Sequence, residues 1–285
     1  MSKNLSLSCL SLLFSVGLLS GGHTAAQTSG AGKLPDILDA LRPHMSPQEV
    51  YAAIQKLDSQ HRVAVDQVLI PDLYGDKPVA YAIGPATMNE EMIYAYLTLP
   101  PDPQVVWQVH RQISKGLNTT SERVLASLRE KYGREFEAPT PAAPAMNLTW
   151  IFDEQGRPAN DARPPMVMKN CLMSGGLQPL ATGLVPTGVA TPSNTVLNDA
   201  LRNERIQLPG STMLNPDTNP CQGLILVKAL LQSNGPYAVQ LEVTISDFGL
   251  QNRSVFALKH VLSSDDARRQ QQELQKAKQQ AAPKL

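Results

Sequence analysis

The sequence lacks an excess of charge of either sign. Its 285 residues carry 25 basic and 25 acidic side chains, so the formal net charge is +0. Proteins that bind the phosphates of nucleic acid or the surface of an anionic membrane need a basic face. We therefore expect neither nucleic acid nor an anionic lipid surface as a partner.

The sequence also lacks the standard motifs of catalysis and metal binding. It contains no G-x-S-x-G, H-E-x-x-H, C-x-x-C, phosphate-binding loop or dinucleotide-binding glycine pattern. We predict no metal and no cofactor. His110 is the best single candidate for a catalytic base, on the strand face opposite Val109, although an ordinary polar strand position explains it as well. A non-catalytic protein is favoured, and a periplasmic hydrolase with an unrecognised active site is the alternative.

Cysteine is scarce, with three residues in the whole chain. Cys9 lies in an N-terminal apolar run, which leaves Cys171 and Cys221 as a pair. In an exported protein such a pair is most simply a disulfide. It would close a loop of roughly 50 residues and stabilise the fold by about 4 kcal/mol on the entropic model. A reactive Cys171 thiol is the alternative interpretation.

Only one stretch resembles a targeting or membrane segment. Lys3 is followed by the apolar run Leu5–Leu19 and by small residues up to Ala26. The run is shorter than the roughly 20 residues that span a bilayer, and its order is typical of a secretory signal. We predict a signal peptide over residues 1–26, no membrane span after its cleavage, and a periplasmic or secreted protein. A retained membrane anchor is the alternative.

Helices are predicted in three parts of the chain. The stretch "LPDILDALRPHMSPQEVYAAIQKLDS" predicts a pair of short helices, the second of which starts with a capping box formed by Ser46 and Glu49. Ser121 is predicted to cap a further helix that stops at Gly133, a residue suited to positive φ. The Gln-rich segment 263–285 lacks an apolar stripe and is predicted to be a solvated helical tail.

Alternating apolar and polar residues predict strands in the rest of the chain. The segments are "HRVAVDQVLI", "KPVAYAI", "EEMIYAYLTL", "QVVWQVHRQI", "NLTWIF", "GLILVKALL" and "YAVQLEVTISDF". We predict an α+β protein in which antiparallel sheets are flanked by helices. The first half (34–138) has a helix pair, a meander and a closing helix, and the second (147–262) is β-rich with a long irregular loop. A Pro/Ala-rich linker at 139–146 joins two structural halves, or crosses the surface of one domain.

The order of these elements resembles known proteins over residues 34–138. "HMSPQEVYAAIQ", paired strands, "VVWQVHRQI" and a helix ending in "REKYG" look like a pattern found in uncharacterised secreted proteins of Gram-negative bacteria. More distantly, the order resembles the small envelope lipoproteins of outer-membrane assembly and the beta-lactamase-inhibitor-protein fold. The resemblance implies a non-catalytic, protein-binding module and identifies no functional residue. We therefore expect a cell-envelope protein as partner.

Two tyrosines are the candidate binding residues. In the strand "IYAYL", Ile93, Ala95 and Leu97 supply a core face, and Tyr94 and Tyr96 stand on the other face. Tyrosine is favoured at protein interfaces because it combines a large apolar ring with a polar tip. We predict that this pair marks the binding surface. The alternative is that both faces of the strand are buried and the tyrosines belong to the core.

Overall fold

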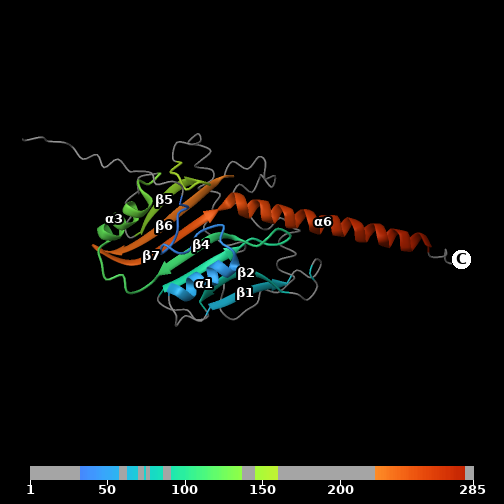
Figure 1. Cartoon of the computed structure of the whole chain (residues 1–285), viewed down its shortest axis with the longest axis horizontal. Coiled ribbons are helices and arrows are strands. Elements are labelled where there is room, and N and C mark those ends of the chain that lie inside the picture. The colour runs from blue at the N-terminus through green and yellow to red at the C-terminus, as the bar shows by residue number, and fades with distance from the viewer. Residues whose placement is uncertain are drawn as a thin grey trace, which may run out of the picture. The chain divides into compact units, whose positions relative to one another are not determined.

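The fold, seen in a computed structural model, is an antiparallel sheet covered by helices (Figure 1). The structure describes residues 33–57, 63–69, 74, 78–85, 91–136, 145–159 and 222–279. Within them the helices are α1 (Pro47–Leu57), α3 (Ser121–Tyr132) and α6 (Phe248–Gln279). The strands are β1 (Val63–Leu69), β2 (Pro78–Pro85), β3 (Glu91–Leu97), β4 (Val106–Ile113), β5 (Ala145–Asp153), β6 (Leu224–Asn234) and β7 (Tyr237–Asp247). The predicted α+β class is confirmed.

The two halves of the sequence share one sheet. Its strand order is β1-β2-β3-β4-β7-β6-β5, and every neighbouring pair is antiparallel. The link is the pairing of β4 with β7, in which Val109 lies opposite Ile245. Residues 139–144 of the predicted linker lie outside the described residues, and Ala145 and Met146 already belong to β5.

The prediction of a helix pair is wrong, because only its second member forms. Residues 37–41 make a tight turn in which Leu38 and Asp39 have φ angles of 56° and 55°. The Asp36 carboxylate accepts a hydrogen bond from the backbone N–H of Asp39 at 2.9 Å, a local bond that competes with helix formation. The helical spacing of Ile37 and Leu41 still indicated burial correctly, since both are in the core.

The predicted helix ends are partly confirmed. In α1, the Ser46 N–H donates to Glu49 at 2.7 Å and the Glu49 N–H donates back to Ser46 Oγ at 3.3 Å, which is a capping box. The N-cap of α3 is Thr120, one residue before the predicted Ser121. Gly133 ends α3 with φ 81° and ψ −156°, a backbone conformation essentially restricted to glycine.

Both faces of the sheet are covered. On the face that we call the helical face, α1 and α3 pack over a cluster that includes Val109, Val227 and Ile245. On the opposite face, Leu250 and Leu258 of α6 belong to a second cluster with Tyr94 and Tyr96. The Ser254 hydroxyl fixes α6 there by donating to the Leu99 carbonyl at 2.9 Å. Because helices cover both faces of the sheet, side chains on both sides of a strand can be buried, including sides whose sequence looks polar.

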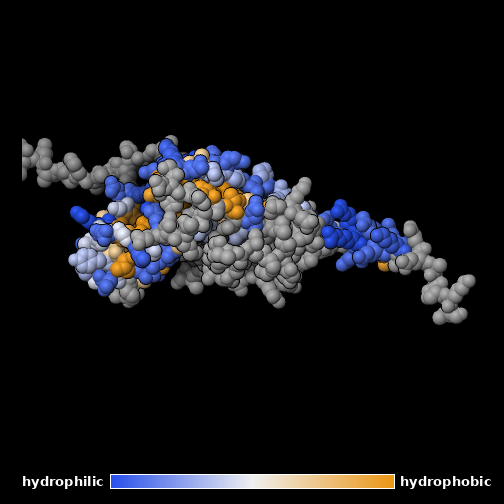
Figure 2. Space-filling model, turned by 90° about the horizontal axis from the view of Figure 1, so that it is seen from below, coloured by the Kyte–Doolittle hydropathy of each residue, from blue (hydrophilic) through white to orange (hydrophobic). Residues whose placement is uncertain are grey.

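The C-terminal tail is the exposed end of a longer helix. Asp247 caps α6 by accepting a hydrogen bond from the Leu250 N–H at 2.8 Å, so no new helix starts near Ser263 as the sequence had suggested. From residue 263 to 276 the described side chains are exposed or half-buried, and Figure 2 shows this segment as hydrophilic. Among the described residues, no helix combines the length and apolar character needed to cross a membrane.

Candidate functional site

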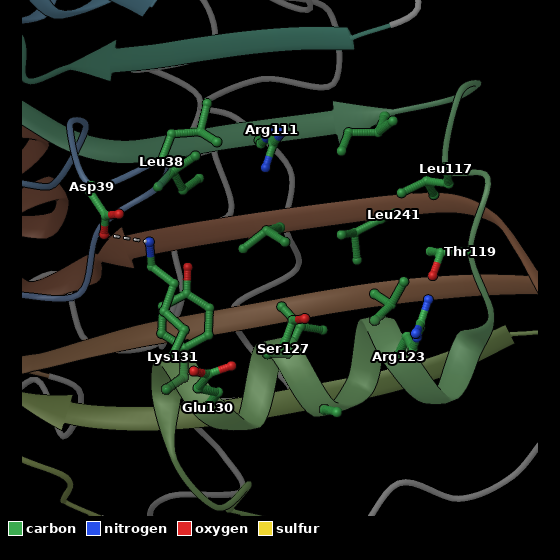
Figure 3. A pocket seen from close by; sticks show the side chains of 17 residues that line it. Leu38, Asp39, Arg111, Leu117, Thr119, Arg123, Ser127, Glu130, Lys131 and Leu241 are labelled. Carbon is green, nitrogen blue, oxygen red and sulfur yellow. Dashed lines mark hydrogen bonds and ion pairs between the residues drawn. The ribbon is translucent and has the colours of Figure 1, made fainter. Parts of the chain in front are cut away.

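The helical face contains a hollow of about 670 Å³. It lies between α3 and the turn at residues 37–39, above β4 and β7, the two strands that join the halves of the sheet (Figure 3). Its volume falls in the range typical of ligand-binding pockets. This hollow is the candidate functional site.

The floor of the hollow is apolar. Ile113 of β4, Leu241 and Val243 of β7, and Val124 of α3 all line it, and Leu117 closes one end. Leu241 and Val243 are buried members of the main core, so the floor is continuous with the interior of the protein. Such a surface favours apolar groups, because contact with it removes them from water.

One charged side chain rises from this apolar floor. The register places Arg111 between Ile93 of β3 and Val243 of β7, in a row of core residues. Its side chain is 22% exposed, and its Nε donates to Glu91 Oε1 at 2.8 Å. In the described part of the chain this is the only hydrogen bond of the guanidinium. Figure 3 shows Arg111 pointing from β4 into the hollow.

One wall of the hollow is held in place by a buried carboxylate. The Asp36 carboxylate lies 2.9 Å from Lys131 Nζ and 2.8 Å from Lys33 Nζ. The Tyr132 hydroxyl donates a hydrogen bond to the backbone carbonyl of Asp36 at 2.8 Å. Burial opposes ionisation of Asp36, but the hydrogen bonds from the two lysines outweigh it and lower its pKa. Tyr132 is also buried, and its own burial raises the pKa of its hydroxyl. These contacts attach the turn at 37–39 to the end of α3.

The rim of the hollow carries charges of both signs. Lys131 reaches Asp39 at 3.1 Å, Glu130 lies beside it, and Arg123 lies near Thr119 at the other end (Figure 3). Arg123, Glu130 and Lys131 are exposed residues of α3. The rim can therefore hydrogen-bond to both donors and acceptors of a bound molecule.

The structure corrects the prediction that Tyr94 and Tyr96 form an exposed surface. Their side chains are 8% and 6% exposed, and both belong to the second core cluster, where their ring centroids lie 6.3 Å apart. Tyr94 covers Gly84 of β2 so closely that a Cβ on that glycine would clash with the tyrosine ring. The pair is core because the opposite face of β3 is also covered.

His110 also lies away from the hollow, on the opposite face. There it is half-buried rather than open to solvent, and Nδ1 lies 2.9 Å from Thr244 Oγ1. Burial lowers the pKa of His110, and the negative charge of Glu242 opposes the shift only in part. Trp107 and Val109 alternate in the sequence as if they shared a face, but they lie on opposite faces, because Trp107 is the extra residue of a bulge opposite Tyr96 and Leu97.

Lys228 provides a pH-dependent prediction. It lies opposite Thr244 in the row that contains His110, and burial lowers its pKa from 10.5 to about 8. Between these values the unfolded chain binds more protons, so this group makes the fold more stable as pH rises from about 8 to 10.5. We expect the stability of the wild type relative to Lys228→Met to rise by up to about 3 kcal/mol between pH 7 and pH 10.5. Urea unfolding of both proteins across this pH range measures the change, and a stability difference that does not vary with pH would contradict a lowered pKa of the half-buried Lys228.

The remaining predicted sites are not assessed by the structure. Cys171 and Cys221 lie outside the described residues, so their disulfide stays a prediction. Within the described ranges, no three His, Cys, Asp or Glu side chains are grouped so that they could hold a metal ion.

Sequence reasoning missed the hollow and Arg111. The signal was present in "QVVWQVHRQI", where Arg111 shares the phase of Val109 and Ile113. A charged residue on the apolar side of a strand is unusual and marks a place where the core is open. No protein-family model, curated protein or solved structure matches the chain, so the resemblance suggested by the sequence stays a prediction.

Proposed function

We propose that this chain is an exported, non-catalytic binding module of the periplasm or the extracellular space. Its hollow holds a segment of a cell-envelope protein. The observation that carries the proposal is the apolar floor formed by Ile113, Leu241 and Val124 between two packed elements. A concave apolar surface with a polar rim is the usual composition of a site that accepts a protein segment.

The rim favours a protein segment over a purely apolar ligand. Arg123, Glu130 and Thr119 offer donors and acceptors that an acyl chain does not use, whereas a peptide backbone presents both kinds of group along its length. The signal peptide predicted for residues 1–26 supports the envelope as the location.

The second candidate function is a hydrolase, and one observation favours it. The Thr244 hydroxyl lies 2.9 Å from the His110 imidazole, the arrangement of a nucleophile and its general base. Against this reading, Thr244 is 2% exposed, so a substrate has little access to its oxygen. The binding function therefore has the stronger support.

Site-specific photo-crosslinking in cells of the native host tests the binding function. A photoreactive amino acid at Ser127, an exposed residue on the rim, should capture one envelope protein. The matched control is the same amino acid at Glu122, an exposed residue of α3 outside the hollow lining. Leu117→Lys, which places a charge at the end of the apolar floor, should abolish the capture from Ser127.

Two outcomes would contradict the proposal. Equal capture from Ser127 and Glu122 would show that the contact does not involve the hollow. If a folded His110→Ala variant no longer supports the function of the protein in the cell, while capture from Ser127 is unchanged, the hydrolase would be favoured instead.

A further inference from the structure

We infer that the segment bound in the hollow carries an acidic side chain between apolar ones, and that Arg111 binds its carboxylate. This inference rests on the proposed function and specifies the chemistry of the partner. It starts from the position of Arg111, which occupies a core row between Ile93 and Val243 instead of the rim.

The hydrogen bonding of Arg111 leaves it able to take a ligand. The Glu91 carboxylate contacts only Nε, at 2.8 Å, and Glu91 itself is 41% exposed. A guanidinium can bind a carboxylate through two parallel N–H groups, and this bidentate geometry uses donors that Glu91 does not. The Arg111 side chain points into the hollow (Figure 3). A ligand carboxylate can bind there beside Glu91 or in its place.

The surroundings of Arg111 strengthen such a contact. The apolar floor formed by Ile113, Leu241 and Val243 keeps the guanidinium at 22% exposure, where screening by water is weaker than on the rim. The same floor receives apolar side chains on either side of the acidic one. Lys131 is less suited to this role, because its ammonium already contacts Asp36 and Asp39.

Two capped peptides test the inference on the full chain. The probes are N-acetylated, C-amidated Leu-Val-Glu-Val-Leu and its Gln analogue, titrated against 15N-labelled protein while backbone amide shifts are followed. We expect shifts at Ile113, Leu117 and Leu241. We also expect about tenfold tighter binding of the Glu peptide, because a hydrogen bond to an ionised carboxylate is stronger than one to a neutral amide. Arg111→Gln should remove this preference.

Controls separate a binding role of Arg111 from a structural one. Arg134→Gln makes the same charge change at an exposed position outside the hollow lining and should keep the preference. Glu91→Gln removes the internal competitor and should make the Glu peptide bind more tightly, which loss of a structural ion pair would not do. This second variant keeps the test informative if Arg111→Gln does not fold.

The possible failures are distinguishable. Equal binding of both peptides in the hollow would overturn the role of Arg111 and leave the proposed function standing. No shift at the hollow from either peptide at millimolar concentration would overturn both. If decanoate shifts the amide signals of Ile113 and Leu241 and neither peptide does, the hollow is a site for anionic amphiphiles. This result would also overturn both the role of Arg111 and the proposed function.

Discussion

Replacing Tyr94 and Tyr96 together by Ser is expected to unfold the protein. Both rings are buried, Tyr94 packs on Gly84, and the Tyr96 ring lies 6.2 Å from that of Trp107. Removing one large aromatic side chain from a core costs about 3–5 kcal/mol, and the pair together approaches the whole stability of a typical domain. Circular dichroism during urea titration should show no cooperative transition for the double variant.

The control for this prediction is the double Phe variant, which retains both rings. It should unfold cooperatively, with a modest loss from the two hydroxyl groups. A double Ser variant with the urea midpoint of the wild type would show that the tyrosines lie on the surface, as the sequence had suggested.

Trp150→Ala is expected to destabilise the protein by about 3–5 kcal/mol. Trp150 is 1% exposed, and its ring packs against Tyr132 at a tilt of 50° with the ring centroids 5.4 Å apart. Its Nε1 donates to the Gly133 carbonyl at 2.9 Å. The substitution therefore removes packing beneath α3 and also leaves the end of that helix without its donor. The free energy of unfolding from denaturant titration measures the effect.

Trp150→Phe separates the two contributions. It keeps an aromatic ring against Tyr132 and removes the donor to Gly133, so we expect a loss of about 1–2 kcal/mol for the hydrogen bond and the smaller ring. Equal destabilisation by Phe and Ala would mean that the hydrogen bond dominates and that the packing of the ring against Tyr132 contributes little.

The sequence predicted the positions of helices and strands more accurately than which of their faces are buried. Alternation in "YAVQLEVTISDF" located β7, and Ser46 with Glu49 located the start of α1, because both signals depend on residues near each other in the chain. Burial of Tyr94 was not predictable in this way. Whether the second side of a strand meets water or α6 depends on residues more than a hundred positions away, such as Leu258.

The hollow was unpredictable for a related reason. It needs a turn at Leu38 and Asp39, where helical spacing had suggested a helix, and it needs β4 beside β7, which no local pattern encodes. The bulge at Trp107 also shifts the phase of β4, so Trp107 lies on the opposite face from Val109 although the two residues alternate in the sequence.

The pairing of β4 with β7 also constrains how the chain folds. His110 and Thr244 are 134 residues apart, yet they lie side by side in the sheet. During synthesis from the N-terminus, β4 emerges with an unpaired edge that persists until β7 is available. Contacts over such distances slow folding, and an open apolar edge invites pairing with other chains. Until its last strands are made, β4 is therefore the edge at which the nascent chain is most open to pairing with other chains.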